Sequence, residues 1–229
     1  MNDQLLKNTK LFHSLTDDEM DQIIKKMNVR KFKKNKTILY EEDTNEFMYV
    51  ILSGKVKVIR TTEDGKEIIL AIHKSGSFFG EMSLIDGKTS PASVIATEDA
   101  LIAILAKKDF FSVVFHHNRV TGNLLKILCS RLRRAWDTIQ LLNFNNASNR
   151  TKMLLLMLTE EYGEKTPEGT VLDIKLTHQD ISDMTGLTRE TVTRVIDKLQ
   201  KQKEIIVLKN RFICLTPRFM KNDINIPTC

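Results

Sequence analysis

The sequence predicts an α+β fold, in which an all-β N-terminal domain, one long helix and a mixed C-terminal domain follow one another along the chain. Three observations lead to this prediction. Short runs of β-branched residues, separated by glycine and aspartate turns, recur between residues 37 and 105. A proline-free segment over 118–144 has helical periodicity, and residues 176–215 combine two short helical patterns with two strand-like runs.

Length and composition narrow the class of protein. A chain of 229 residues can form two domains with separate cores, and we expect them at 1–117 and 145–229, joined by a helix over 118–144. The content of 41% hydrophobic and 28% charged residues is that of a globular protein, and no apolar run approaches the length of a membrane span. Since the N-terminus also lacks the apolar core of a signal peptide, we expect a cytoplasmic protein with no membrane partner.

The N-terminal domain is predicted to be a β-roll with a helical lead-in. Apolar residues at helical spacings over 4–28 indicate the lead-in, and the period changes from Val29. The lysines within 31–36 suit a solvated strand edge that resists pairing with other chains. The strand-like runs, with no helices expected between them, are 37–40, 47–52, 56–59, 68–72, 94–96 and 101–105. Regular short strands of this kind predict an antiparallel sandwich or roll.

A long helix is predicted for residues 118–144. Its apolar residues alternate at three- and four-residue steps, as in the a/d seam of a coiled coil, and they are Leu125, Leu128, Leu132, Ala135, Ile139 and Leu142. We expect this seam to pair with the same helix of a second subunit; the alternative is that it packs on the roll of its own chain. A polar break over 144–149 predicts a hinge, followed by a helix over 150–162 and a loop over 163–170.

Two short helical patterns occupy residues 176–199. Thr177 can cap the first helix by accepting from the amide of Asp180, and Asp180 can return the bond as in a capping box. Gly186 lies where the turn between the helices needs a left-handed backbone. Thr188 can cap the second helix. The predicted buried face of that helix consists of Val192, Val195, Ile196 and Leu199.

The polar face of the second helix suits base recognition. Arg189 and Glu190 lie in its first turn, and Arg194 follows Glu190 by four residues. In a helix-turn-helix this end enters the major groove, where arginine can donate to guanine and glutamate can accept from cytosine. The alternative is a solvated face with an ion pair between Glu190 and Arg194.

A basic hairpin is predicted after the helix pair. Apolar runs at 205–208 and 212–215 flank the turn Lys209-Asn210-Arg211, which completes a winged helix-turn-helix with a turn suited to phosphate contact. Residues 176–222 hold nine basic against five acidic side chains, and the chain has a formal charge of +6, which fits a polyanionic partner. The expected contacts to double-stranded DNA are Thr177, Thr188, Arg189, Glu190, Thr191, Arg194, Lys209 and Arg211.

These segments, in this order, resemble the Crp/Fnr family of the cyclic-AMP receptor protein and the fumarate-nitrate regulator over nearly the whole chain. The matching motifs are Leu52–Val58, Glu63–Glu67, Gly76–Leu84 and Thr188–Arg194. The resemblance implies a cyclic-nucleotide-binding-like roll and a homodimeric transcription regulator that binds two-fold symmetric promoter DNA and contacts RNA polymerase. Members with Arg-Glu and a further Arg at the positions of Arg189, Glu190 and Arg194 read TGTGA-type half-sites. The polymerase-contacting loop of the cyclic-AMP receptor protein matches Glu164, Thr166 and Glu168.

The resemblance also implies an effector pocket where the roll meets the dimer helix. Its matching residues are Gly80, Glu81, Met82, Ser90, Pro91, Ala92, Arg131, Ala135 and Trp136. In cyclic-nucleotide-binding members an arginine and a following hydroxyl residue clamp the phosphate, but Ser90 and Pro91 stand there in this chain. Losing a charge-assisted partner should weaken phosphate binding by roughly 10²-fold or more, so ordinary cyclic-AMP sensing is not expected. The alternatives are a cyclic nucleotide held by Lys88 or Arg131, a less anionic ligand, or a turn that binds nothing.

The residue types also bear on whether the chain holds an iron-sulfur cluster or haem, and on whether it is an enzyme. An iron-sulfur cluster needs four thiolates, and only Cys129 lies near the sensor domain, so this cofactor is excluded. Haem needs an axial ligand, and the candidates are His73, His116 and His117. Haem is not expected, because a histidine is more often a surface or capping residue than a haem ligand. An enzyme is not expected either, since there is no phosphate-cradling glycine loop, metal-spaced cluster or nucleophile elbow. The second hypothesis is a ligand-binding module that acts through protein contact, with a structural helix-turn-helix.

Overall fold

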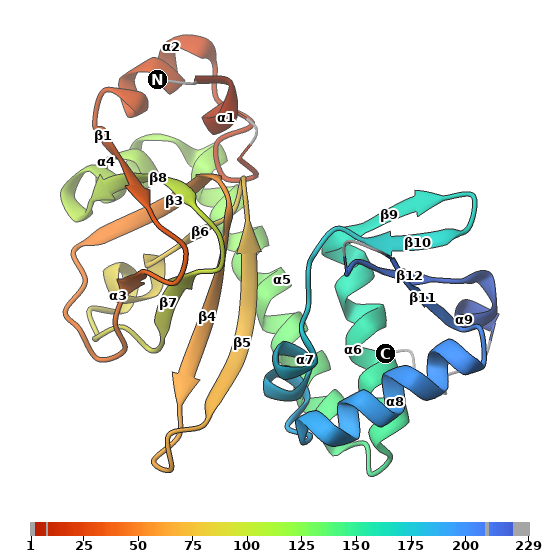
Figure 1. Ribbon diagram of the computed structural model, residues 1–229. Helices are drawn as coiled ribbons and strands as arrows, with labels where there is room; N and C mark the ends of the chain where they lie inside the picture. The colour runs from red at the N-terminus through yellow and green to blue at the C-terminus, as the bar shows by residue number, and fades with distance from the viewer. Residues whose placement is uncertain (1–2, 8, 209–210, 222–229) are drawn as a thin grey trace. The chain divides into compact units, whose positions relative to one another are not determined.

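The computed structural model describes residues 3–7, 9–208 and 211–221, and the chain forms two units, Met1–Arg131 and Leu132–Cys229 (Figure 1). The first unit contains two antiparallel four-stranded sheets. One has the order β1-β8-β3-β6, formed by Met27–Phe32, Ala100–Ala106, Phe47–Ser53 and Phe78–Phe79. The other has the order β2-β7-β4-β5, formed by Thr37–Leu39, Ser93–Ala96, Lys55–Thr61 and Glu67–Lys74. The predicted antiparallel roll is therefore confirmed.

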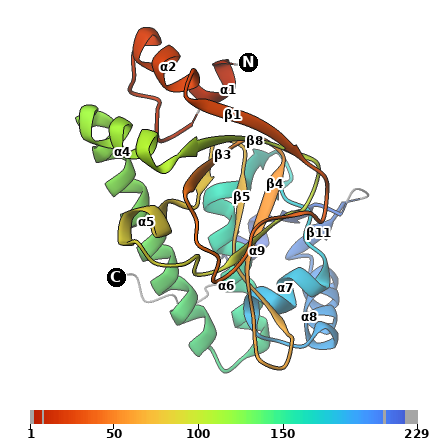
Figure 2. The same ribbon diagram turned by 90° about the vertical axis from the view of Figure 1, so that its left-hand side faces the viewer.

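Strand β3 separates two hydrophobic cores because successive side chains of a strand point to opposite faces. Tyr49 and Ile51 enter the core between the two sheets, whereas Met48, Val50 and Leu52 enter the core on the other face. Helices cover this second core (Figure 2), namely α1 (Asp3–Lys7), α2 (Asp17–Ile24), α4 (Lys107–His116) and the first turns of α5 (Asn118–Asn143). Burial on both faces explains why β3 reads as a continuous apolar run.

Two predictions for the first unit were wrong. Met27 begins strand β1 instead of ending the helical lead-in, because it pairs with Leu105 of β8. The polar residues after Met27 give β1 no apolar alternation, so its strand character comes from that pairing. The expected absence of helices among the strands is also wrong, since α3 spans Glu81–Asp86. This helix is too short for its periodicity to be read from the sequence. The predicted edge is confirmed, because β1 lies at the end of its sheet with Lys31 exposed.

The second unit is a winged helix-turn-helix, as predicted. Its helices are α6 (Ala147–Tyr162), α7 (His178–Thr185), α8 (Arg189–Lys201) and α9 (Pro217–Lys221). Its sheet has the order β11-β12-β10-β9, formed by Ile205–Val207, Ile213–Leu215, Gly169–Leu172 and Gly163–Thr166. Among the residues that the structure describes, no helix is long and apolar enough to cross a membrane.

Two boundaries in the second unit differ from the predictions. The helix after the expected break at 144–149 begins earlier than predicted, at Ala147, because Asn146 caps α6 by accepting from the amide of Ser148. The expected loop over 163–170 is instead the hairpin of β9 and β10. Strand β10 also pairs with β12, and a Cβ at Gly169 would lie 2.1 Å from the carbonyl oxygen of Leu215. The strand assignment therefore depends on residues distant in sequence.

Candidate DNA-binding interface and effector site

The turn between α7 and α8 is built by the capping residues that the sequence identified. Thr177 Oγ1 accepts from the amide of Asp180 at 3.0 Å, and the Thr177 amide donates to Asp180 Oδ2 at 2.8 Å. Gly186 has φ of +66°, a left-handed conformation that side chains with a Cβ adopt poorly. Thr188 caps α8 by accepting from the amide of Thr191. These bonds fix the direction in which α8 leaves the turn.

Helix α8 buries one face and exposes the predicted reading face. Val192, Val195, Ile196 and Leu199 are buried, whereas Arg189, Glu190 and Arg194 are exposed. Within the described residues Glu190 and Arg194 form no ion pair. Arg194 Nη2 instead donates to Thr191 Oγ1 at 3.2 Å, and this hydroxyl is also bonded to the cap Thr188 at 3.0 Å. The hydroxyls of Thr188 and Thr191 therefore orient the reading face. Within the described residues, the side chains of Arg189 and Glu190 form no hydrogen bond or ion pair.

Two further contacts, which the sequence did not reveal, brace the helix pair. His178 Nδ1 lies 2.8 Å from Thr193 Oγ1 and joins the first turn of α7 to α8. Arg150 donates from Nη2 to the Phe144 carbonyl oxygen at 2.7 Å and from Nη1 to the Thr185 carbonyl oxygen at 3.1 Å. Both acceptors lie at helix C-termini, where carbonyl groups lack helical partners. Neither pairing has a fixed sequence spacing, so periodicity could not find it.

A groove of about 560 Å³ runs beside the reading face. Its polar lining comes from Thr177, His178, Gln179, Arg189 and Arg211, and its apolar lining from Leu176, Ile196, Val207 and Ile213. The groove thus brings together three predicted DNA contacts, from the start of α7, the start of α8 and the wing. His178 and Gln179 were not among the predicted contacts, although their place in the first turn of α7 could have suggested them.

The wing is a hairpin whose register pairs Ile205 with Leu215 and Val207 with Ile213. Arg211 is exposed and has φ of +66°, and its amide donates to the Leu208 carbonyl oxygen at 2.8 Å. The predicted contact Lys209 lies outside the described residues. The part of the wing that the structure describes therefore presents one of the two expected basic side chains.

Two of the predicted effector residues, Glu81 and Arg131, form an ion pair. Glu81 is buried, with only 2% of its surface exposed, and Arg131 Nη1 donates to its Oε1 at 2.6 Å. Arg131 Nη2 donates to the Phe78 carbonyl oxygen at 2.5 Å, and the guanidinium carbon lies 4.6 Å from the centroid of the Phe78 ring. The buried carboxylate thus has its counter-charge within the unit, as burial of a charge requires.

Gly80 holds this carboxylate at the start of α3. Its φ is +84°, and a Cβ there would lie 2.7 Å from the carbonyl oxygen of Phe47. The Asn45 amide donates to the carbonyl oxygens of both Phe47 and Gly80, at 2.7 and 2.9 Å. Asn45 is itself buried. The close backbone approach therefore admits only glycine at position 80.

The residues that stand where the resemblance places the phosphate clamp lie in the same unit. Ser90 donates its amide to the Asp43 carbonyl oxygen at 2.9 Å and accepts from the Glu42 amide at 2.8 Å. Its hydroxyl is buried and has no hydrogen-bond partner within the described residues. Pro91 is exposed, and Ala92 is buried. Serine at this place thus supplies an uncharged hydroxyl and no cation.

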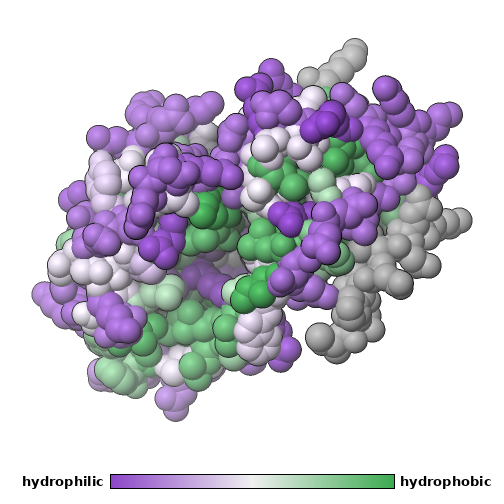
Figure 3. Space-filling view, turned by 90° about the horizontal axis from the view of Figure 1, so that it is seen from below, coloured by the Kyte–Doolittle hydropathy of each residue, from purple (hydrophilic) through white to green (hydrophobic). Residues whose placement is uncertain are grey.

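Three other predicted pocket residues are exposed. Met82 lies on the outer face of α3, away from the buried Glu81, with 52% of its surface exposed. Ala135 and Trp136 lie on α5 in the second unit, and both are exposed. Nothing in the structure assigns these three to the ion-pair cluster. Exposed apolar side chains also form patches on the face drawn in Figure 3.

The predicted seam is largely exposed on this chain. Leu125, Leu132, Ala135, Ile139 and Leu142 are exposed, and Leu128 alone of the six packs against the core of the roll. Within the first unit, the alternative that the seam packs on its own roll therefore accounts for Leu128 but not for Leu125.

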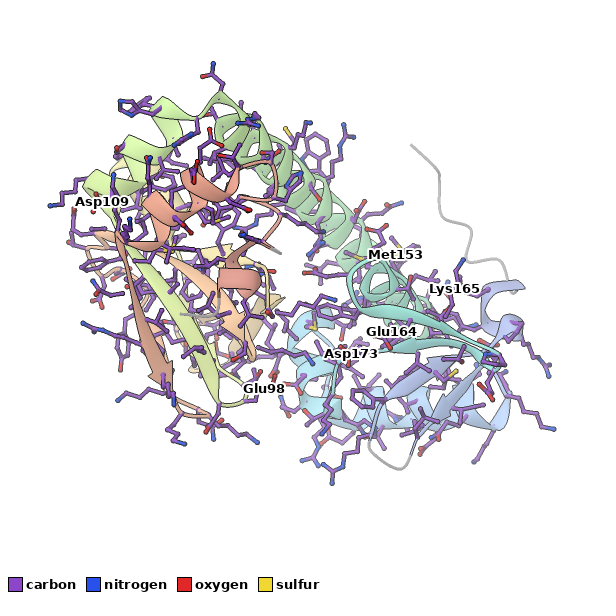
Figure 4. The ribbon with its side chains drawn as sticks, turned by 90° about the horizontal axis from the view of Figure 1, so that it is seen from above. Glu98, Asp109, Met153, Glu164, Lys165 and Asp173 are labelled. Atoms are coloured by element: carbon purple, nitrogen blue, oxygen red, sulfur yellow. The ribbon has the colours of Figure 1, made fainter. Side chains whose placement is uncertain are left out.

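The remaining candidate residues occupy ordinary positions. Glu164 and Glu168 are exposed on the hairpin of β9 and β10, where Thr166 Oγ1 donates to the Gly169 carbonyl oxygen, and Figure 4 marks Glu164 and Lys165. His116 Nδ1 lies 2.7 Å from the Ser112 carbonyl oxygen, and His117 Nδ1 lies 3.5 Å from Glu19. His73 is buried. Among the described residues no group of three histidine, cysteine or acidic side chains is placed to hold a metal ion.

Comparisons with known proteins match both units. Residues 29–117 match the cyclic nucleotide-binding domain, and residues 149–220 match the Crp-like helix-turn-helix domain. The chain is 34% identical to the cyclic AMP receptor protein of Thermus thermophilus, over 86% of this chain and 88% of that one. The chain belongs to the Crp/Fnr family of transcription regulators. It is also 30% identical to the global nitrogen regulator of Synechococcus elongatus, over 83% of this chain and 87% of that one.

A solved structure shares the Crp/Fnr fold. FixK2 from Bradyrhizobium japonicum has a TM-score of 0.74 and 24% identity, and the match covers 86% of this chain and 97% of that one. This likeness supports the order of a roll, a long helix and a winged helix-turn-helix. The chain is thus a DNA-binding transcription regulator with an effector-binding domain, and its relatives indicate no enzymatic family.

Proposed function

We propose that this Crp/Fnr regulator is a homodimer that reads a palindrome of TGTGA-type half-sites. The observation that carries the proposal is the exposed trio Arg189, Glu190 and Arg194 at the N-terminal end of α8. Arginine in the major groove can form a fork with guanine, and glutamate can accept from the amino group of cytosine. The neighbouring groove and Arg211 of the wing supply polar groups for the adjoining phosphates.

The homodimer is supported by the seam. Five of its six apolar residues are exposed at heptad spacing, and exposed leucine and isoleucine on a helix indicate a missing partner. A two-fold symmetric palindrome requires two α8 helices on the same side of one duplex, which requires the α5 helices to be parallel. The partner is therefore a second copy in parallel orientation.

The effector of the proposed regulator is an unidentified ligand other than cyclic AMP. Glu81 is already paired with Arg131, and Ser90 offers a hydroxyl where a cyclic phosphate would need a cation. The exposed residues Glu164 and Glu168 of the β9–β10 hairpin are proposed to contact RNA polymerase, together with Thr166. The cytoplasm is the proposed location.

Fluorescence anisotropy of a labelled TGTGA palindrome, at fixed salt, tests the reading face. Arg189→Ala should lose discrimination between this palindrome and a scrambled duplex by roughly 10- to 100-fold, since a bidentate base contact contributes about 1–3 kcal/mol. The matched control is Lys201→Ala, which removes a cation from the far end of α8. Unchanged discrimination in Arg189→Ala would refute the assignment of the reading face.

The same measurement with and without cyclic AMP tests the effector assignment. Binding that does not respond to cyclic AMP is expected, and a large enhancement would overturn the exclusion of this ligand. Absent or salt-insensitive DNA binding would instead favour a module that acts through protein contact, because phosphate contacts make affinity depend on salt.

A further inference from the structure

The second unit contains one histidine, His178, in the first turn of α7. The ring is partly buried and lines the groove beside the reading face. Among protein side chains, imidazole is the one that ordinarily changes its charge between about pH 5 and 8. The other four histidines of the chain, all in the first unit, are His13, His73, His116 and His117. A response to pH that arises in the DNA-binding unit can therefore be assigned to one side chain.

The bond to Thr193 determines which ring nitrogen of His178 carries a hydrogen. The Thr193 hydroxyl has one hydrogen and donates it to the Arg189 carbonyl oxygen at 3.0 Å. Its oxygen therefore offers a lone pair to His178 Nδ1, which lies 2.8 Å away. Both bonds are made only when Nδ1 carries the hydrogen and donates to Thr193. In the neutral ring Nε2 is then an acceptor, and it forms no hydrogen bond within the described residues.

The charged side chains that share the groove with His178 are cations. They are Arg189, at the start of α8, and Arg211 of the wing. No carboxylate lines the groove in the part of the chain that the structure describes. The acidic residues of α7 and α8, which lie outside this lining, are Asp180, Asp183, Glu190 and Asp197. Two arginines disfavour a third positive charge in the groove, whereas a bound phosphate favours it.

A proton on Nε2 changes what the ring can bind. The phosphate oxygens of DNA only accept hydrogen bonds, so the lone pair of a neutral Nε2 repels them. A protonated ring donates through both nitrogens, and its Nε2 can form a charge-assisted bond to a phosphate. Because Nδ1 keeps its bond to Thr193 in both states, the ring stays in place and α7 stays joined to α8.

We propose that His178 binds a DNA phosphate only in its protonated form, so that the regulator takes up a proton at this ring when it binds DNA. The affinity for DNA then rises as pH falls through the range in which imidazole titrates. Since the contact is to the backbone, it changes the affinity for every duplex and leaves discrimination among sequences unaltered. This inference rests on the proposed reading face of α8, which determines where the duplex lies.

Fluorescence anisotropy of the full chain, with the labelled TGTGA palindrome and a scrambled duplex at fixed salt, tests the proposal. One proton taken up on binding corresponds to a limiting slope of about 10-fold in affinity per pH unit. Wild-type affinity for both duplexes should therefore rise roughly 10-fold or more between about pH 8 and pH 6. His178→Asn keeps an amide donor for Thr193 but has no nitrogen that titrates. Its affinity should stay near the high-pH value of the wild type throughout.

Calorimetry provides a second measurement that needs no variant. Wild type is titrated with the palindrome at one pH, in two buffers of different ionisation enthalpy, and the difference in heat gives the number of protons taken up. Uptake is expected near pH 7 and should vanish in His178→Asn. Binding without proton uptake by the wild type would overturn the proposal even if His178→Asn failed to fold.

His116→Asn is the matched control, because His116 Nδ1 also makes a hydrogen bond, 2.7 Å from the Ser112 carbonyl oxygen, but in the first unit. This variant should keep the wild-type response to pH. A response that persists in His178→Asn, or that is lost equally in His116→Asn, would overturn the assignment to His178 while the palindrome is still preferred. A wild type that shows no preference for the palindrome at any pH would overturn the proposed reading face instead.

Discussion

Replacing Gly186 tests how the helix-turn-helix depends on one backbone conformation. The residue has φ of +66°, and a Cβ there would come no closer than 3.8 Å to Leu142 and 3.9 Å to Arg150. Gly186→Ala therefore adds no steric clash, and its cost is that of placing a side chain in the left-handed region. This cost amounts to about 1 kcal/mol, because the strain is partly offset by the lower entropy of the unfolded chain.

The matched comparison is Gly80→Ala. Gly80 also has a left-handed backbone, with φ of +84°, but the Phe47 carbonyl oxygen would lie 2.7 Å from the added Cβ. Because this clash is with the backbone, Gly80→Ala should lower the free energy of unfolding by roughly 2–4 kcal/mol. Gly186→Asn should be milder than Gly186→Ala, because asparagine tolerates the left-handed region.

Urea unfolding of the full chain, followed by circular dichroism, compares the three variants, and hydrogen exchange of amides in α7 and α8 localises the effect to the second unit. Gly186→Ala should accelerate exchange in these helices, and Gly186→Asn should do so less. Equal destabilisation by Gly186→Ala and Gly80→Ala, or by Gly186→Ala and Gly186→Asn, would contradict the argument from backbone conformation.

Three further outcomes are expected. Ser90→Arg combined with Pro91→Ser should restore a phosphate clamp and raise affinity for cyclic AMP by roughly 10²-fold, and calorimetry showing no gain would contradict the assignment of this position. Leu132→Asp should convert the dimer to a monomer in sedimentation while leaving circular dichroism unchanged, since a charge cannot be buried in an a/d seam. Burial raises the pKa of the Cys214 thiol, so its reactive thiolate stays scarce as pH rises through the ordinary thiol range. Mass mapping should find exposed Cys129 alkylated before Cys214, which should be modified only on unfolding.

The sequence predicted the elements whose signals are local. The caps at Thr177 and Thr188, the left-handed Gly186 and the buried stripe of α8 all follow from spacings of three or four residues, and the structure has them as expected. The strands of the roll were also predicted from local signals, namely short runs of β-branched residues between turn residues. The roles of the reading residues in DNA recognition stay predictions.

Other elements depended on partners far away in the chain. Strand β1 exists through its pairing with β8, and the β9–β10 hairpin through its pairing with β12. The Glu81–Arg131 pair joins residues 50 positions apart. No local motif could therefore predict that Arg131 would neutralise the Glu81 carboxylate. The sequence placed Arg150 only at the start of a predicted helix, whereas its guanidinium bridges two helix ends.

That bridge sets a rule for building chimeric regulators. The Phe144 carbonyl oxygen at the end of α5 and the Thr185 carbonyl oxygen at the end of α7 share one donor, Arg150. A transplant of the DNA-binding module onto a foreign sensor should therefore be spliced upstream of Phe144, so that donor and both acceptors travel together. A junction between Phe144 and Arg150 would replace the Phe144 segment by an unrelated sequence. Arg150 would then lose one of its two acceptors, and the start of the DNA-binding module would be less stable.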